Sequence, residues 1–233
     1  MRLMTVPGVF RPRSDSLMLA RQVSACVRPG DRVLDPFTGS GLLAVVAARA
    51  GATATAVDVS RRAVACTRAN ARLNGVRVRA LHGDMLAPVG RERFDLIVAN
   101  PPYVPSVAER RPRGAARAWE AGGDGRALLD RLCREAPANL SEHGSLLIVH
   151  SSLCAPETTR AMLAEAGLEV EVLERRRGPL GPLLGERAEL LERRGHLRPG
   201  EREEELVIVR AGRPPGQRFA GARAGRESAC APV

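Results

Sequence analysis

The sequence predicts an α/β fold in which helices cover both faces of a mostly parallel β-sheet. Along the middle of the chain, short apolar runs rich in Val, Leu and Ile alternate with segments of helical periodicity. This alternation is typical of parallel strands joined by crossover helices. The 233 residues are enough for one such domain with a sizeable core, and no internal repeat is evident. We therefore expect a single α/β domain over residues 29–211.

Strands and crossover helices are expected to alternate through this domain. The strands are expected at residues 32–37, 53–60, 76–84, 94–100, 145–152, 168–175 and 204–211. The helices are expected at residues 41–51, 60–75, 124–142 and 155–167. Ser60 is suited to cap the second helix and Asn74-Gly75 to end it, while Asp124 is suited to cap the third. Pro137 disturbs the third helix near its end.

Three segments lie outside this alternation. Residues 1–28 begin with a loop, continue with a helix expected from Ser16 to Val27, and are expected to form an N-terminal lid. Residues 178–203 are rich in Arg, Gly, Pro and Leu. They are expected to be an insertion before the last strand, with a short amphipathic helix at residues 186–195. Residues 212–233 show no apolar periodicity and are expected to be a disordered tail.

Composition indicates a reduced, cytoplasmic protein. The formal net charge is +10, and all 36 basic residues are Arg. A basic chain can bind nucleic acid, but Arg spread over every element, together with abundant Ala and Gly, favours a solvated surface and a GC-rich coding bias. The five Cys lack a CxxC spacing and the four His do not cluster, so neither a disulfide framework nor a metal site is expected. The N-terminus lacks a signal peptide and Arg49 breaks the longest apolar run, so no membrane span is expected.

A glycine-rich turn follows the first expected strand in the sequence "LDPFTGSG". Gly39, Gly41 and Ala44 satisfy the GxGxxG/A pattern of dinucleotide-binding turns, although glycines in such turns often serve packing alone. Asp35 stands at the end of the strand, where its carboxylate would repel a pyrophosphate and attract an ammonium or a sulfonium. The turn therefore favours a cationic ligand over NAD.

Two further carboxylates close the next two expected strands. Asp58 ends the second strand, where an acid can accept hydrogen bonds from ribose hydroxyls. Asp84 ends the third strand, where it can accept from an adenine amino group while Met85 packs on the ring. Each Asp alone is more often a helix cap or a turn residue. Acids at three successive strand ends, without a phosphate-binding Lys, nevertheless predict a pocket for S-adenosylmethionine (SAM).

The fourth expected strand stops abruptly at Asn100-Pro101-Pro102-Tyr103. If the first and fourth strands are neighbours, these residues border the cofactor's methyl group in the same crevice as Asp35. The Asn100 side-chain carbonyl and the Pro101 backbone carbonyl, which Pro102 makes rigid, can accept the N–H groups of a planar nitrogen. They would stabilise its developing positive charge, and Tyr103 offers the planar group a flat face. The alternative is a strand terminator with a packed Tyr.

Several motifs together resemble those of HemK/PrmC-type protein-glutamine N-methyltransferases. They are "GVFRPRSDSLMLA", "VLDPFTGSG", "AVDVS", "HGDML", "FDLIVANPPYVP" and "ARAWEAGGDGRALLDRL", and the resemblance extends over about residues 9–210. The chain is similar to the short form of eukaryotes and archaea rather than to the longer bacterial form, whose N-terminal helical domain grips a release factor. The resemblance implies a Rossmann-like class I SAM-dependent methyltransferase, with a seven-stranded, mostly parallel sheet whose last strand is antiparallel.

The resemblance also implies roles for individual residues. The residues expected to contact SAM are Ser16, Asp35, Gly39, Asp58, Asp84, Met85 and Asn100. The residues expected to hold the acceptor amide are Asn100, Pro101 and Tyr103. Ser16 stands where the family has the Thr of a "DT" pair, and its alternative role is a plain helix N-cap. The expected reaction is N-methylation of a glutamine amide in a protein such as a translation release factor.

The sequence leaves more than one possibility for the molecule that accepts the methyl group. Phe37 replaces the glycine usual in this family, and "DPFTGSG" resembles the turn of DNA amino-methyltransferases. The alternative reaction is therefore N-methylation of a nucleobase exocyclic amine in DNA or RNA. An NAD-binding oxidoreductase and a catalytically silent SAM-binding protein are opposed by Asp35 and by the intact "NPPY". Trp119 is either a substrate-facing platform in a lid or a packed Trp.

The resemblance raises the question of an activator as well. The short form in eukaryotes and archaea works with a small zinc-binding activator that covers a sheet edge. The third expected strand would be that edge here, and it carries Arg77 and Arg79, which are typical of a protected edge. An obligate activator subunit is therefore not expected.

Overall fold

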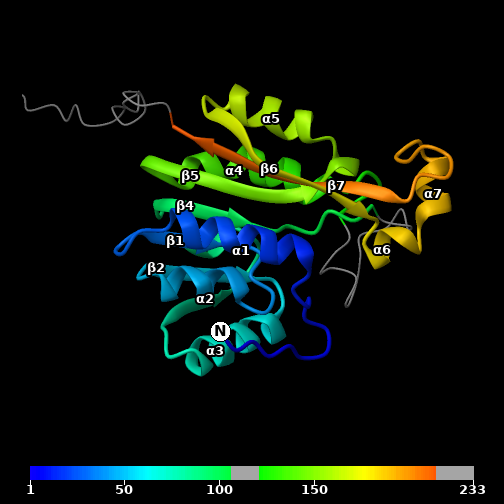
Figure 1. Cartoon of the computed structure of the whole chain (residues 1–233). Coiled ribbons are helices and arrows are strands. Elements are labelled where there is room, and N and C mark those ends of the chain that lie inside the picture. The colour runs from blue at the N-terminus through cyan, green and yellow to red at the C-terminus, as the bar shows by residue number, and fades with distance from the viewer. Residues whose placement is uncertain (106–120, 214–233) are drawn as a thin grey trace, which may run out of the picture.

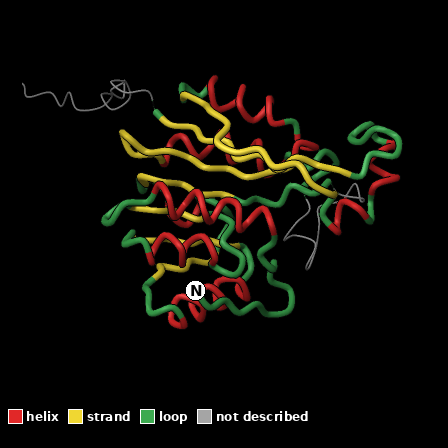
Figure 2. Tube along the Cα trace, in the orientation of Figure 1, coloured by secondary structure: helices red, strands yellow, loops and turns green. Residues whose placement is uncertain are grey.

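One mixed β-sheet organises the part of the chain that this computed structural model describes, residues 1–105 and 121–213. Its strands are β1 (Arg32–Asp35), β2 (Thr53–Asp58), β3 (Val78–His82), β4 (Phe94–Ala99), β5 (Leu140–Ser151), β6 (Glu169–Pro179) and β7 (Glu203–Gly212). They lie side by side in the order β3-β2-β1-β4-β5-β7-β6, and Figures 1 and 2 show the sheet that they form. Strands β1 to β5 pair in parallel, and β7 is antiparallel to both β5 and β6. The predicted seven-stranded sheet with an antiparallel last strand is confirmed.

Helices cover both faces of this sheet (Figure 1). The helices are α1 (Ser14–Cys26), α2 (Leu42–Arg49), α3 (Arg61–Leu73), α4 (Ala127–Glu135), α5 (Pro156–Glu165), α6 (Pro182–Gly185) and α7 (Ala188–Arg193). Short 3-10 turns lie at η1 (Ala87–Val89), η3 (Ala136–Asn139) and η4 (Ser152–Cys154). Within the described residues, none of these helices is long and apolar enough to cross a membrane.

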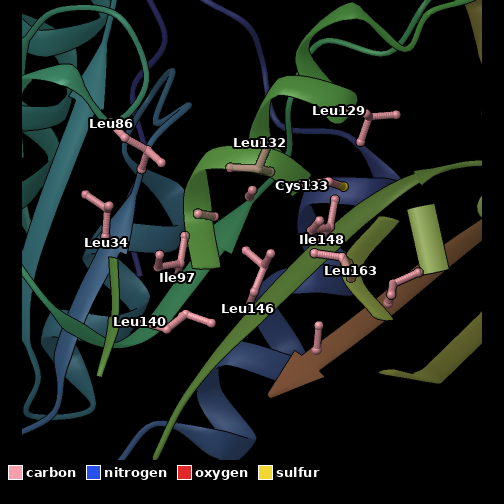
Figure 3. Close-up of a cluster of buried hydrophobic side chains, with 14 of the residues drawn as sticks. Leu34, Leu86, Ile97, Leu129, Leu132, Cys133, Leu140, Leu146, Ile148 and Leu163 are labelled. Atoms are coloured by element: carbon pink, nitrogen blue, oxygen red, sulfur yellow. The ribbon is translucent and has the colours of Figure 1, made fainter. Parts of the chain in front are cut away.

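Two apolar clusters separate the sheet from its covering helices. Figure 3 shows the first, in which Leu34, Ile97 and Ile148 from the strands meet Leu132 of α4 and Leu163 of α5. The second cluster joins α1 and α2 to the opposite face of the sheet; its members include Met18, Leu19, Val23, Val33, Leu43, Val98 and Val149. Neighbouring strand residues alternate between the clusters because successive side chains point to opposite faces. Both faces are therefore apolar, which explains the nearly continuous apolar runs of the sequence.

Local turn chemistry fixes α3 as predicted. The Ser60 hydroxyl accepts the Ala63 N–H at 3.4 Å at the start of the helix. The helix ends at Asn74, and Gly75 follows with φ +67°, in the left-handed region that glycine adopts without steric cost.

The third crossover differs from its prediction. Helix α4 stops at Glu135, the turn with Pro137 follows, and β5 begins at Leu140 rather than at residue 145. The early start is possible because β5 carries an irregularity: Phe94 pairs with Leu140, but Leu96 pairs with Ser145. The predicted capping role was also wrong. Asp124 accepts the Arg126 N–H at 2.9 Å in the turn before the helix, and Arg126 itself occupies the N-cap.

The insertion before β7 forms its own small cluster. Since β6 extends to Pro179 and β7 begins at Glu203, the insertion comprises residues 180–202. The predicted amphipathic helix is α7, which together with α6 packs on Val104. The members of this cluster are Val104, Leu184, Ala188, Leu191 and Leu197. The insertion thus lies directly beside the end of the "NPPYV" segment. The predicted tail began at residue 212, but Gly212 still belongs to β7; residues 214–233 lie outside the described residues.

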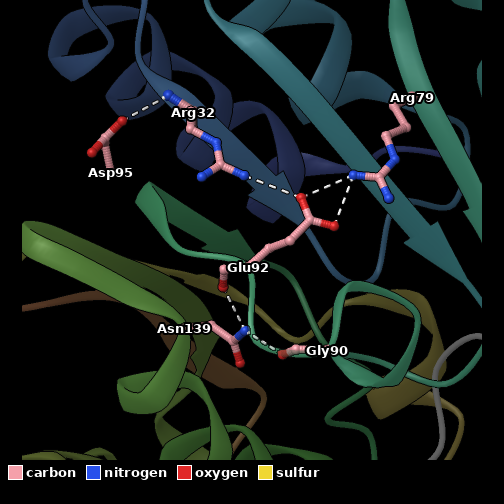
Figure 4. Close-up of polar contacts among 6 residues, drawn as sticks. All are labelled: Arg32, Arg79, Gly90, Glu92, Asp95 and Asn139. Atoms are coloured by element: carbon pink, nitrogen blue, oxygen red, sulfur yellow. Dashed lines mark hydrogen bonds and ion pairs between the residues drawn. The ribbon is translucent and has the colours of Figure 1, made fainter. Parts of the chain in front are cut away.

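A polar network stabilises the amino ends of the strands (Figure 4). The Glu92 carboxylate accepts from Arg79 at 2.9 Å and from Arg32 at 3.1 Å, which links β1 to β3. The Asn139 amide donates to the carbonyls of Gly90 and Glu92 at 2.8 and 2.7 Å. In open α/β sheets, ligands bind at the opposite, carboxyl edge, so this network serves stability.

Candidate active site

The carboxyl edge of the sheet brings the predicted site residues together. Strand β1 lies between β2 and β4, so the loops after Asp35 and Asp58 and the segment after Ala99 share one edge. The chain crosses to β2 on one side of β1 and returns to β4 on the other. This reversal is the topological position at which α/β sheets bind ligands. The predicted neighbourhood of the first and fourth strands is confirmed.

Asp35 is a buried acid with an unused oxygen. Its side chain is fully buried, and only Oδ1 accepts a hydrogen bond, from the Phe37 N–H at 3.4 Å. Oδ2 has no hydrogen-bond partner among the described residues. Burial raises the pKa of Asp35 from 3.8 to about 7; the nearby charge of Asp58 acts in the same direction, and the Thr38 hydroxyl and the Phe37 N–H partly oppose the rise. A buried acceptor without a partner is unfavourable on its own, and a cationic N–H donor such as the ammonium group of SAM would satisfy it.

The glycine turn is shaped by its contacts with α3. Gly41 has φ +87°, and a Cβ there would lie 2.9 Å from the Thr67 side chain. Gly39 has φ +52°, and its N–H donates to Asp58 Oδ2 at 2.9 Å. Asp58 also accepts the Ser60 N–H at 2.8 Å. The Asp58 carboxylate therefore fixes the turn against the end of β2, and its predicted contact with a ribose stays a prediction.

Asp84 and Met85 stand at the end of β3. Asp84 forms an ion pair of 2.5 Å with Arg131 of α4, and its side chain is 58% exposed. Met85 is 2% exposed, packs in the first cluster and has φ +50°. A non-glycine residue in this region carries roughly 1–3 kcal/mol of strain, which the surrounding core must hold. Because the thioether is buried, an adenine ring would meet the Met85 backbone rather than the side-chain surface that the sequence suggested.

Asn100 has a fixed orientation. Its side-chain Nδ2 donates to Asp15 Oδ2 at 3.2 Å and to Ser16 Oγ at 3.0 Å. A carboxylate can only accept, so the NH₂ group of the amide must face Asp15. Among the described residues, none donates to Asn100 Oδ1. The amide oxygen is thus held on the side away from α1, available to an N–H of an acceptor molecule.

Asp15 joins this arrangement and was missed by the sequence prediction. It is 5% exposed and also accepts from the Tyr103 hydroxyl at 2.8 Å and from the Ser16 N–H at 2.6 Å. Burial raises the pKa of Tyr103 well above its usual value, and the negative charge of Asp15 adds to this effect. Tyr103 therefore stays a neutral donor. The available signal was its position directly before Ser16, as the acid of the family's "DT" pair.

Ser16 connects the N-terminal helix to the site. It lies in the first turn of α1, after the N-cap at Arg13, so the alternative role as a plain N-cap is wrong. Its hydroxyl accepts from the Arg13 N–H at 3.4 Å and from Asn100. Helix α1 itself packs in the second cluster on the sheet. Its predicted behaviour as a lid stays a prediction.

The loop before α4 and the η4 turn both contact the "NPPY" backbone. The Cys154 thiol donates to the Tyr103 carbonyl at 3.0 Å. Gly125 has φ +75°, and a Cβ there would lie 2.3 Å from the same carbonyl. The buried Arg126 guanidinium donates to the carbonyls of Cys154 and, at 2.9 Å, Ala155. Trp119 lies outside the described residues, so its predicted platform role stays a prediction.

The fold and this site define a class of enzyme. A Rossmann-like sheet of this strand order, an unpaired buried carboxylate beside a glycine turn and a rigid Asn-Pro-Pro-Tyr segment are what a class I SAM-dependent methyltransferase requires. Within the described residues, no group of three or more His, Cys, Asp or Glu side chains is placed to hold a metal ion.

Comparison with known proteins identifies the family. The chain belongs to the methyltransferase small domain family, which matches residues 1–178. It is 33% identical over 180 residues to a protein of Methanocaldococcus jannaschii provisionally named protein N5-glutamine methyltransferase, covering 76% of this chain and 90% of that protein. It is 38% identical over 180 residues to the release factor glutamine methyltransferase of Bordetella pertussis, covering 73% of this chain and 66% of that protein. The predicted enzyme class and the predicted cofactor, SAM, are confirmed.

Solved structures share the fold. The Mtq2–Trm112 complex of E. cuniculi, which methylates the termination factor eRF1, matches with a TM-score of 0.63 and 20% identity over 89% of this chain and 99% of that chain. A 16S rRNA methyltransferase of T. thermophilus in complex with AdoMet and guanosine matches with a TM-score of 0.60 and 22% identity, covering 91% of this chain and 47% of that chain. The match spans 46–66% of the length of the bacterial glutamine methyltransferases to which the chain is similar.

Proposed function

We propose that this methyltransferase transfers the methyl group of SAM to the side-chain amide nitrogen of a glutamine in a protein, such as a translation release factor. The observation that carries the proposal is the fixed orientation of Asn100, whose NH₂ group is held by Asp15 and Ser16. The names of the relatives support it, because they describe glutamine methyltransferases of release factors and of ribosomal protein uL3.

The residues of the site suit a planar, weakly nucleophilic nitrogen. SAM supplies a methyl group activated on a sulfonium when it is bound. As the amide nitrogen would form its bond to that methyl carbon, the methyl–sulfur bond would break with its electron pair left on sulfur, and positive charge would develop on the amide N–H groups. Asn100 Oδ1 and the Pro101 carbonyl accept these groups and stabilise the charge. No ionised base is needed, because the proton leaves for solvent after the transfer.

The acids of the carboxyl edge are proposed to hold the cofactor. Asp35, with its unpaired Oδ2, would accept from the ammonium group. Asp58 would accept from the ribose hydroxyls, and Asp84 from the adenine amino group. Gly39 would allow close approach of the cofactor to the turn. The protein is further proposed to act in the cytoplasm, where translation factors are found.

The acceptor is tested by transfer of labelled methyl groups. Purified enzyme and methyl-tritiated SAM are incubated separately with release factors, ribosomal proteins, total RNA and DNA. Label is expected in a protein, at a glutamine, and replacement of that glutamine by alanine in the acceptor is expected to abolish it. Label found in nucleic acid alone would contradict the proposal and support the nucleobase alternative, which Phe37 in "DPF" leaves open.

Variants of Asn100 and Asp15 test the mechanism. Asn100→Ala is expected to lower transfer by about two powers of ten or more, the scale of losing a transition-state acceptor, while SAM still binds. Asp15→Asn is expected to lower transfer about tenfold, because the amide of Asn100 loses a charged partner. Asp31→Asn, which removes a carboxylate bonded to the Arg28 N–H before β1, is the matched control. Wild-type turnover by Asn100→Ala would exclude the assigned role.

A further inference from the structure

Charge is distributed unevenly along the sheet. Residues 49–79 carry seven Arg and one acidic residue, Asp58, whereas residues 157–210 carry ten Arg and twelve acidic residues. The first segment comprises β2, α3 and the start of β3 at one end of the sheet, and the second comprises most of α5, β6, the insertion and most of β7 at the other (Figure 1). A coding bias toward Arg would act on the whole chain. It does not explain why acidic residues are missing from one end only.

The outer face of α3 is the centre of the basic end. Arg61, Arg62, Arg68 and Arg72 are exposed, while Val64, Thr67 and Asn70 are among the residues that form the buried face. At a rise of about 1.5 Å per residue, the stripe from Arg61 to Arg72 extends for about 16 Å. Arg77, also exposed, continues the basic surface toward the edge strand β3.

Ion pairing differs between the two ends of the sheet. Within the described ranges, Arg61, Arg62, Arg72 and Arg77 have no carboxylate within ion-pairing distance. Three of the four arginines of β6 and β7 are neutralised across the two strands. The pairs are Arg175–Glu205 at 2.7 Å, Arg177–Glu203 at 2.7 Å and Arg210–Glu171 at 3.1 Å. Within the described part of the chain, the α3 face therefore carries four guanidinium groups without a carboxylate partner, whereas the three pairs at the β6–β7 end are neutralised.

We propose that this basic face, defined by Arg61, Arg62, Arg72 and Arg77, binds the phosphate backbone of RNA. Guanidinium groups bind phosphate with bidentate geometry and release condensed counterions. Neither α3 nor β3 carries a Phe, Tyr or Trp on which a base would stack. Binding is consequently directed at the backbone and is independent of base sequence. The choice of RNA among polyanions rests on the proposed function, because release factors and ribosomal proteins work on the RNA-rich ribosome.

The basic face is separate from the proposed acceptor site. The insertion and Val104, next to Tyr103, lie toward the β6–β7 end of the sheet, whereas α3 packs beside β2 and β3. RNA bound at α3 would hold the enzyme near its protein substrate and would not present a base to Asn100. Methyl transfer to a free protein acceptor is therefore independent of this face.

Fluorescence anisotropy with a labelled uridine RNA of about 20 nucleotides tests the proposal over salt concentrations from about 50 to about 200 mM. The dissociation constant is expected at about 10⁻⁶–10⁻⁴ M near physiological salt, with a steep salt dependence. The triple variant Arg61→Gln, Arg62→Gln, Arg72→Gln is expected to weaken binding at least about tenfold at low salt. A plot of the logarithm of the association constant against the logarithm of salt concentration should also become less steep. The magnitude of its slope should decrease by about 2, or about 0.7 per lost phosphate contact.

A charge-matched variant distinguishes RNA binding at this particular surface from RNA binding that depends only on the net charge of the protein. Arg175→Gln, Arg177→Gln, Arg210→Gln removes the same formal charge from the neutralised end and is expected to change binding less than about twofold. Equal weakening by both variants, absence of RNA binding at low salt, or equally effective competition by polyglutamate would each overturn the proposal. Protein methylation measured with each variant distinguishes a failure of this proposal from a failure of the proposed function.

Discussion

Two buried carboxylates at the carboxyl edge of the sheet have opposite environments. Asp15 accepts from Ser16, Asn100 and Tyr103, so its charge is compensated by protein donors. Asp35 is equally buried but keeps Oδ2 without a partner among the described residues. Buried polar atoms are normally hydrogen-bonded. Asp15 is therefore satisfied by the protein itself, while Asp35 keeps an acceptor that is consistent with its proposed role in binding SAM.

The raised pKa of Asp35 predicts a pH dependence of SAM binding. In the free protein burial raises this pKa from 3.8 to about 7, so the carboxyl group is largely protonated at pH 6 and ionised at pH 8. Because a cationic ligand binds the ionised form, affinity should rise about tenfold per pH unit below the pKa and level off above it. Calorimetric titration from about pH 5.5 to about pH 8.5 measures this profile. Asp35→Asn should weaken binding and flatten the profile, and a flat profile in the wild type would refute the assignment.

Individual residues also show which parts of the site could be predicted from local sequence and which could not. Asn100, Pro101 and Tyr103 were identified because a double proline after an apolar run is a local signal. Asp15 was missed because its bonds to Asn100 and Tyr103 join residues 85 and 88 positions apart. No local pattern records such a contact. The ion pair of Asp84 with Arg131 was missed for the same reason.

At the scale of elements, most strands and helices were predictable because burial on both faces produces apolar runs and capping residues mark helix ends. The failure at residues 140–142 has a tertiary cause. The sequence after Pro137 suits a helix locally, but pairing of Leu140 with Phe94 extends β5 backward across an irregularity. Gly144 permits this, because a Cβ there would lie 2.6 Å from the Phe94 carbonyl. Pairing between distant strands thus overrode local propensity.

The contact between the loop before α4 and the "NPPY" backbone can be tested by substitution of Gly125. Gly125→Ala would place a Cβ 2.3 Å from the Tyr103 carbonyl and 3.0 Å from the Cys154 thiol, at φ +75°. The loop or the "NPPY" backbone must therefore move, and transfer is expected to fall at least about tenfold, since small displacements at a reacting centre have large effects. SAM affinity, which we propose depends mainly on Asp35 and Asp58, should change little. Both quantities are measured on the same preparation.

Gly123→Ala is the matched control for this test. Gly123 lies in the same loop, its φ is not positive, and a Cβ there would meet nothing within 4 Å. Its transfer rate should equal that of the wild type. Equal losses in both variants would mean that the loop, and not the contact with Tyr103, determines activity.

On the scale of the whole molecule, the sheet separates three tasks along its width. The α3 end is basic, the centre at β1 and β4 carries the buried acids and Asn100, and the β6–β7 end places the insertion against Val104. The sequence correctly predicted that the first and fourth strands are neighbours at this centre. It could not indicate the ends, because net charge and composition do not say which arginines find a carboxylate once the strands are paired.

The edge of the sheet at β3 yields the last prediction, that the chain is folded and monomeric without an activator. Mtq2, which shares this fold, is solved with Trm112. In this chain the edge is occupied by its own side chains. Arg68 of α3 donates to the Ala80 carbonyl at 2.7 Å, Arg79 pairs with Glu92 at 2.9 Å, and both arginines are exposed. Charged side chains on an edge strand oppose pairing with another chain.

Light scattering after size exclusion is therefore expected to give a monomer, and thermal unfolding should be cooperative and shift upward with SAM. Arg68→Leu, which exposes the Ala80 carbonyl and adds an apolar surface beside it, should increase aggregation on heating. The control is Arg176→Leu on β6, the strand at the other edge of the sheet. Among the described residues, Arg176 forms no ion pair or side-chain hydrogen bond. Rapid aggregation of the wild-type chain, reversed only by co-expression with a Trm112-like protein, would show that β3 needs a partner after all.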